Sequence, residues 1–403
     1  MILLPKKITQ NNPQINSSGD SLGDPQNPQN SDAVFAIDGS ALAKIQAGQI
    51  YLIATKQGVG VKMESEILAS QTLNLDANGD IYYNKISVGD NANLKSSGTI
   101  QTSDSNSKIS APTINITANQ FNNSGLVLAQ NLNIYDIKNL NNLGDLEALD
   151  LKLTNLDNTD NSGIIFAENS LNISGKNLTN NASGNIYSPQ DYAINLNDLL
   201  SNSGLISSAK NLTLNSNQLN NSGEISALNN LDFLITNSLN NLGLISSANN
   251  LTLNSNQLNN SGEISALNNL DFLITNSAIN SGSLIANNNF NLNLTNNLTN
   301  FGILSSLGSF NINGNSNITN DNQILSNGNL NIFAQNLTNN HLIQSNKNLT
   351  LNLNSLTNNN NIISGDEFNI LALKDVTNSG FLESLKGFNI IAENVSNTGS
   401  ALI

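Results

Sequence analysis

The chain contains no cysteine and no tryptophan, and His341 is its single histidine. Without cysteine, the protein can form neither disulfides nor thiolate metal sites. With one histidine, neither a histidine-based metal cluster nor a Ser-His-Asp triad can form within one chain. The lack of cysteine is compatible with an extracytoplasmic protein that crosses a membrane unfolded.

Positive charge and long apolar runs are also scarce. The 15 Lys and Arg residues face 29 Asp and Glu residues, for a net charge of −14, which disfavours a nucleic-acid partner held through its phosphates. No apolar stretch approaches the length of a membrane-spanning helix, so no transmembrane segment is expected. Residues 1–7 place two lysines after a very short apolar run, the reverse of a signal peptide. We therefore expect no export signal in this chain as written.

Asn, Ser and Leu recur along most of the chain, as expected of stacked repeats or of disorder. A hydrophobic content of 38% argues against disorder, and with 11% charged and 4% aromatic residues it predicts a core that is narrow and long. Residues 1–33 are rich in Asn, Pro, Ser and Gly. We interpret them as a linker or disordered lead.

An internal repeat decides the fold class. Residues 204–238 and 243–277 are the same string, except that Lys210 in the first copy is Asn249 in the second. Asn322, His341 and Asn360 occupy three of the slots of a glycine series with steps of about 20 residues. The glycines of this series, which we call the marker positions, are Gly125, Gly144, Gly163, Gly184, Gly204, Gly223, Gly243, Gly262, Gly282, Gly302, Gly380 and Gly399.

Apolar residues stand at fixed offsets from each marker: two residues on, then eight and ten, then fifteen or sixteen. In the coil of Gly204 these are Ile206, Leu212, Leu214 and Leu219. The alternation around Leu212 and Leu214 is typical of a strand with one buried face. Each repeat is too short to bury its own apolar face, so the repeats must stack. The sequence predicts an all-β protein, a right-handed parallel β-helix (solenoid) with coils of about 19–20 residues and three short strands per coil.

A leucine-rich repeat is the main alternative fold. Residues 212–219 fit the string L-x-L-x-x-N-x-L. In the alternate coil Ser238 stands where that pattern needs Asn, and no convex-side helical segment is evident. The β-helix is therefore favoured.

Asparagine stands two residues before nearly every marker, for example at Asn221, Asn241 and Asn260. We predict that these side chains form a ladder of amide hydrogen bonds along the stack. We also predict that the marker needs positive φ, which glycine adopts freely and which Asn and His tolerate next best. At Gly184 the asparagine is displaced by one residue, to Asn181, which indicates a local irregularity.

Near its start the chain contains AIDGSAL at residues 36–42, AGQIYLIATKQGVGV at residues 47–61 and LNLDANGDI at residues 73–81. This resembles the end of the haemagglutination activity domain of filamentous haemagglutinins and contact-dependent inhibition proteins, with the first repeat that follows it. On this basis residues 34–101 are expected to form the end of such a domain and the first β-helix coils. Residues 102–403 are then expected to be a haemagglutinin-type repeat β-helix.

The resemblance implies a structural and adhesive rod segment of a large secreted bacterial surface adhesin. The family's upstream secretion domain is not found, so we expect a fragment of a longer product. For the full-length protein the resemblance implies an outer-membrane two-partner secretion transporter, an extracellular or cell-surface location, and a carbohydrate or protein partner on host or bacterial cells. One alternative is the delivery stalk of a contact-dependent growth inhibition toxin. Another is a polysaccharide-degrading β-helix enzyme.

We predict no catalytic, cofactor-binding or metal-binding residues and no cofactor. By its register His341 is a turn residue. A polysaccharide-degrading β-helix would need clustered carboxylates. The acidic pairs Asp366 with Glu367 and Asp76 with Asp80 are isolated on different coils, and we interpret them as solvated surface residues.

Overall fold

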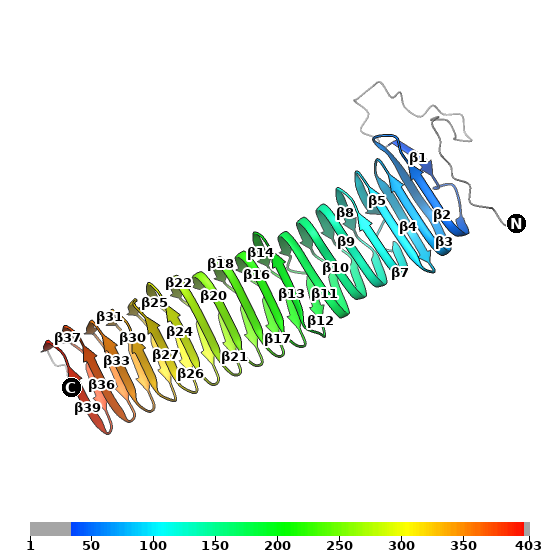
Figure 1. Ribbon diagram of the computed structural model, residues 1–403. Coiled ribbons are helices and arrows are strands. Elements are labelled where there is room, and N and C mark those ends of the chain that lie inside the picture. The colour runs from blue at the N-terminus through cyan, green and yellow to red at the C-terminus, as the bar shows by residue number, and fades with distance from the viewer. Residues whose placement is uncertain (1–33, 399–403) are drawn as a thin grey trace. The chain divides into compact units, whose positions relative to one another are not determined.

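The computed structural model describes residues 34–398, so the predicted lead at residues 1–33 lies outside the described residues. The chain divides into two compact units, Met1–Gln190 (unit 1) and Asp191–Ile403 (unit 2). Each is a parallel β-solenoid whose coils stack one on the next (Figure 1). Together they contain about 18 turns of about 20 residues, with three strands in each turn. The predicted parallel β-helix is therefore confirmed, and the leucine-rich repeat alternative is wrong.

In unit 1, strands join around the corners, so that β9, β10 and β11 each follow almost a whole coil. The strands of this unit are β1 (Val34–Asp38), β2 (Lys44–Ala54), β3 (Val59–Ala77), β4 (Ile81–Val88), β5 (Asn91–Ser96), β6 (Thr99–Thr102), β7 (Lys108–Thr117), β8 (Gln120–Asn123), β9 (Leu126–Asn142), β10 (Asp145–Asn161), β11 (Ile164–Asn180) and β12 (Asn185–Ser188).

Unit 2 has three faces, and each is a ladder of parallel strands. The first face begins just after each marker and is built from four-residue strands. They are β15 (Leu205–Ser208), β17 (Glu224–Ala227), β19 (Leu244–Ser247), β21 (Glu263–Ala266), β23 (Ser283–Ala286), β26 (Ile303–Ser306), β29 (Gln323–Ser326), β32 (Leu342–Ser345), β35 (Asn361–Ser364) and β38 (Phe381–Ser384).

The second and third faces share four long strands that bend from one face into the other at a register shift. These are β16 (Leu212–Asn221), β18 (Leu231–Asn241), β20 (Leu251–Asn260) and β22 (Leu270–Asn280). The other strands of the second face are β13 (Tyr192–Leu196), β24 (Phe290–Leu294), β27 (Phe310–Gly314), β30 (Leu330–Phe333), β33 (Leu349–Leu353), β36 (Glu367–Ala372) and β39 (Gly387–Ile391). Those of the third face are β14 (Leu199–Asn202), β25 (Asn297–Asn300), β28 (Asn317–Asn320), β31 (Asn336–Asn339), β34 (Ser355–Asn358), β37 (Asp375–Asn378) and β40 (Asn394–Asn397).

The core lies inside the coil, at the offsets that the sequence predicts. Ile206, Leu212, Leu214 and Leu219, one set from a single coil, are all fully buried. Identical offsets in successive coils bring like side chains into contact along the stack. The rings of Phe290 and Phe310, for example, stack at 4.4 Å. Parallel pairing and a shared core leave each coil dependent on its neighbours for both hydrogen bonds and burial.

The division into residues 34–101 and 102–403 rests on the resemblance and stays a prediction. Within residues 34–398 no helix is long and apolar enough to span a membrane.

Candidate functional site

The most regular polar feature is the asparagine at the end of each third-face strand. Asn260 is 1% exposed, and its side-chain Nδ2 donates to Oδ1 of Asn280 at 2.8 Å and to the carbonyl oxygens of Gly262 and Ser283 at 3.1 and 3.2 Å. Its own Oδ1 accepts from Asn241. The predicted ladder is confirmed, because it satisfies amides and turn carbonyls that would otherwise be buried without partners.

The ladder continues through all the described coils of unit 2. Its members are Asn202, Asn221, Asn241, Asn260, Asn280, Asn300, Asn320, Asn339, Asn358, Asn378 and Asn397. In unit 1 a ladder of the same kind links Asn123, Asn142, Asn161 and Asn180. At Gly184 the ladder residue is thus Asn180 and not Asn181. Asn180 lies four residues before its marker, whereas the other ladder residues lie two before theirs. The side chain of Asn181 instead donates to Ser162.

The prediction that markers need positive φ is wrong. Among residues 34–398, positive φ is found at Gly58, Gly314, Asp136 and Asn155, and at none of the marker positions. Glycine is favoured at the markers by close stacking instead. A Cβ atom on Gly262 would lie 2.1 Å from the carbonyl oxygen of the preceding marker, Gly243, far inside van der Waals contact.

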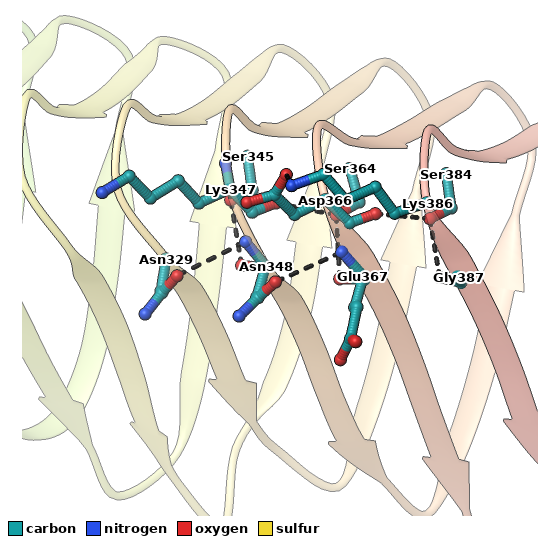
Figure 2. A network of polar contacts seen from close by, with 10 residues as sticks. All are labelled: Asn329, Ser345, Lys347, Asn348, Ser364, Asp366, Glu367, Ser384, Lys386 and Gly387. Carbon is teal, nitrogen blue, oxygen red and sulfur yellow. Dashed lines mark hydrogen bonds and ion pairs between the residues drawn. The ribbon is translucent and has the colours of Figure 1, made fainter.

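A second polar ladder, at the end of the first face, is one that sequence reasoning missed. Serines there, most of them buried, place Oγ within hydrogen-bond distance of two carbonyl oxygens, one on the preceding coil and one three residues ahead, and the single hydroxyl proton is shared between the two. In Figure 2, Ser364 donates in this way to Lys347 at 2.8 Å and to Glu367 at 2.9 Å. The serines that make both bonds are Ser247, Ser306, Ser326, Ser345, Ser364 and Ser384. The available signal was a small residue, Ser or Ala, four positions after each marker from Gly125 to Gly380.

The acidic residues that the sequence pointed to make separate local contacts. Asp366 pairs with Lys386 at 2.5 Å, while Glu367 is exposed (Figure 2). Asp76 lies 3.8 Å from Lys95, and Oδ1 of Asp80 accepts from the backbone N–H of Thr99 at 2.7 Å. Within residues 34–398 no three His, Asp or Glu side chains lie close enough together to hold a metal ion.

His341 is an exposed turn residue between β31 and β32, as its register predicts. Its backbone carbonyl accepts from the N–H of Asn361 and from the side-chain amide of Asn339. The backbone at this position therefore accepts the hydrogen bonds that join the coils.

Two tyrosines are buried in different surroundings. Burial raises the pKa of both Tyr83 and Tyr192 well above that of a free phenol. The hydroxyl of Tyr192 donates to the carbonyl of Ser207 at 3.0 Å, whereas the hydroxyl of Tyr83 has no partner among the described residues. Both phenols stay protonated at neutral pH, and Tyr83 lies inside the solenoid away from any surface.

A hollow on the surface of unit 1 is lined by backbone and short polar side chains. Gln57, Asn78, Asp80 and Ser97 border it, together with three glycines. Asp80 supplies its only carboxylate, and that carboxylate already accepts from the N–H of Thr99. The polar groups of the described residues are thus used mainly for stacking coils.

No protein-family model, no curated protein and no solved structure matches this chain.

Proposed function

We propose that this chain is a structural and adhesive segment of a large secreted bacterial surface protein of the filamentous haemagglutinin type, and that it has no catalytic activity. Two features support the proposal. Residues 36–81 resemble that family, and both units are built from coils that repeat a single set of contacts. The proposed location is extracellular or at the cell surface, reached by the full-length protein through a two-partner secretion transporter.

The observation that carries the adhesive role is the repetition of outward polar groups. On the third face of unit 2, Asn240 donates to Asn220 and Asn259 donates to Asn240, each at 2.8 Å. On the second face Asn311 bonds to Asn291 and Asn331 bonds to Asn311, at 2.9 and 2.8 Å. Over three successive coils each of these rows presents one amide per coil, about every 4.8 Å. Weak contacts of each amide with carbohydrate or protein add up through multiplicity.

The test is binding of the purified chain to cell-surface glycans and to whole cells at increasing surface density. We expect weak binding by the chain in solution and strong binding when it is displayed densely, because multiplicity supplies the affinity. A double variant, Asn240→Ala with Asn259→Ala, removes two outward amides and should weaken dense-surface binding. The control variant, Leu234→Ala with Leu273→Ala, trims exposed apolar side chains of the second face. Absence of binding at every density would contradict the adhesive role.

Two further assays separate the alternatives. Incubation with bacterial and host polysaccharides, followed by measurement of new chain ends, tests for a degrading enzyme; any turnover would contradict the non-catalytic proposal. Sequencing of the gene downstream tests the delivery-stalk alternative. A toxin domain followed by an immunity gene would replace the adhesin with a stalk.

A further inference from the structure

The outer side of the first face of unit 2 is richer in apolar side chains than the other two faces. In each four-residue strand the second and fourth residues point into the core, and the first and third point outward. The outward apolar residues are Leu205, Leu244, Ile285, Ile303, Leu325, Leu342, Ile363 and Phe381. Phe381 is 47% exposed.

The turns at both margins of this face extend the apolar surface. Before the strands, Leu242 and Phe301 are 71% and 52% exposed. After the strands, Leu228, Leu267 and Leu307 are 69%, 63% and 54% exposed. Leu385 continues the second margin in the last coil. The strands β17 and β21 interrupt this surface, because their outward residues are glutamate and serine. Exposed apolar side chains gathered on one face among polar ones mark an interaction site.

The dimensions of the surface suit a partner of comparable size. Its ten strands, β15 to β38 of the first face, form one uninterrupted parallel ladder. At about 4.8 Å per strand along the stack, and about 20 Å across a strand with its flanking turn residues, the footprint is roughly 900 Å². A stable protein interface buries about 800 Å² on each partner.

We propose that this face is a dimerisation surface, and that a second copy of the chain packs on it face to face with its coils in reverse order. Two such sheets pack about 10 Å apart. A two-fold axis parallel to the strands lays the first strand of one copy opposite the tenth of the other, the second opposite the ninth, and so on. The proposal rests on the first face alone and does not depend on an adhesive role.

With the coils reversed, the outward side chains match across the interface. Leu205 faces Phe381, and Leu244 faces Leu342, so apolar residues meet. Glu224 faces Asn361, and Glu263 faces Gln323, so each carboxylate meets an amide donor. In four further pairs a large aliphatic residue meets serine. These pairs are Ser226 with Ile363, Ser265 with Leu325, Ser283 with Ile303, and Ile285 with Ser305. In the last two pairs polar residues meet, Ser207 with Glu383 and Ser246 with Gln344.

The turn residues that follow the strands also match across the interface when the coils are reversed. Leu228 faces Gly365, and Leu385 faces Ala209, so two of the most exposed leucines each meet a small residue. Leu267 and Leu307 face Asn327 and Asn287, which lie at the same place in their own turns. Large side chains therefore stand over smaller ones along this margin, and two copies can approach without steric conflict.

A parallel arrangement of the two copies is disfavoured by charge. It would bring Glu224 and Glu263 of one copy beside the same residues of the other, and the chain already carries a net charge of −14. No basic residue occupies an outward position on the ten strands of this face to compensate. Reversing the coils separates Glu224 and Glu263 from their own copies and supplies each of these two carboxylates with an amide, while Glu383 faces Ser207.

The first test is the mass of the purified full chain in solution, measured by sedimentation and light scattering over a range of concentrations. We expect a monomer–dimer equilibrium. Leu267→Glu with Leu307→Glu should raise the dissociation constant at least tenfold. The matched control is Leu234→Glu with Leu273→Glu, two leucines of the second face with similar exposure, 50% and 46%. Circular dichroism confirms that both variants keep the β-rich fold.

Three outcomes would overturn the proposal. They are a monomer at every concentration, equal weakening by the two double variants, and a monomer that binds neutral lipid vesicles through this face. The last outcome would assign the apolar surface to a membrane.

The second test determines the orientation. Because the chain has no cysteine, single cysteines can be placed at will. A mixture of Glu263→Cys and Gln323→Cys proteins, treated with a short bis-maleimide, should yield covalent heterodimer, while each variant alone yields little. In the parallel arrangement Glu263→Cys alone would cross-link to itself, and that result would overturn the proposed orientation.

Discussion

The turns from Gly223 to Gly302 and those from Asn322 to Gly380 carry the same asparagine ladder but differ in their backbone hydrogen bonds. In the first group both the marker and the residue before it donate to one ladder carbonyl. Gly262 and Ser261, for example, donate to Asn241 at 3.1 and 2.8 Å. In the second group, among the described residues, only the residue before the marker makes this bond, as Asn340 does to Asn320 at 2.8 Å.

The second group makes more serine hydrogen bonds at the end of the first face than the first group does. Its four first-face strands all end in serine, at Ser326, Ser345, Ser364 and Ser384. In the first group Ser247 and Ser306 make the same bonds, and Ala227, Ala266 and Ala286 occupy the other three positions. Asn322 also donates its side-chain amide to the carbonyl of Phe301 at 3.0 Å. The comparison teaches that the ladder is common to both groups, while the corner beside it can vary as long as nearby groups satisfy the backbone.

The largest expected effect is the loss of a ladder asparagine in either group. Asn260→Ala leaves the carbonyls of Gly262 and Ser283 without this donor, and leaves the amide of Asn241 without this acceptor. We expect it to lower the free energy of unfolding by about 3 kcal/mol. Asn339→Ala in the second group should cost as much, because the two N–H groups of Asn339 Nδ2 are shared among the same three acceptors. Urea denaturation, with amide hydrogen exchange of the flanking strands, measures both.

The neighbouring Asn259 provides the matched control. It is exposed and bonds to Asn240 on the outer side of the third face. Asn259→Ala should change stability by about 0.5 kcal/mol or less. Equal losses for Asn259→Ala and Asn260→Ala would contradict the view that the buried ladder holds the stack together.

The next effect is expected at the marker glycines of the first group. In Gly262→Ala the new Cβ meets the carbonyl oxygen of Gly243 at 2.1 Å, so the turn must shift and lose a marker hydrogen bond. We expect a loss of about 1–3 kcal/mol. Hydrogen exchange at Gly223, Gly243 and Gly282 would show whether the shift spreads along the stack. A neutral Gly262→Ala would mean that close stacking does not explain the glycines.

A smaller effect is expected at the serines that end the first-face strands. Ser345→Ala removes the Oγ that donates to Gly328 and Asn348, and should cost about 1 kcal/mol. The reverse change, Ala266→Ser in the first group, supplies a hydroxyl where two carbonyls lack one. It should be neutral or slightly stabilising. Thermal denaturation of the two variants tests whether a hydroxyl at this position stabilises the coil. A strongly destabilising Ala266→Ser would contradict it.

The sequence predicts the coil well because a strand's inward and outward positions alternate with period two. Ile206, Leu212 and Leu214 therefore identify the core by spacing alone. The ladder is predictable for a related reason, since in-register stacking brings equivalent asparagines together. The role of the markers is not predictable. Gly, Asn and His are the residues that positive φ selects, but here the selection comes from the carbonyl oxygen of the previous coil.

The buried serines and the apolar outer face could not be predicted from the sequence, for different reasons. Either serine or alanine stands four residues after the markers from Gly125 to Gly380, and that pattern shows only that the site is small. The outward residues of the first face are separated by about 20 positions in the sequence, so their contiguity emerges only when the coils are stacked. Local periodicity identifies a strand, whereas the surface it builds depends on register between coils.

The smallest expected effect is at His341, a marker of the second group, where it can be compared with Gly262→Ala in the first group. This residue already occupies a marker without the second backbone bond, and its exposed side chain lies in the turn before β32. His341→Ala keeps a Cβ atom at the position, and should change the free energy of unfolding by no more than about 0.5 kcal/mol. Hydrogen exchange at Asn361, whose N–H donates to the carbonyl of His341 at 3.0 Å, should be unchanged. A loss as large as that of Gly262→Ala would show that marker side chains matter in both groups, and that the second group is not the more tolerant one.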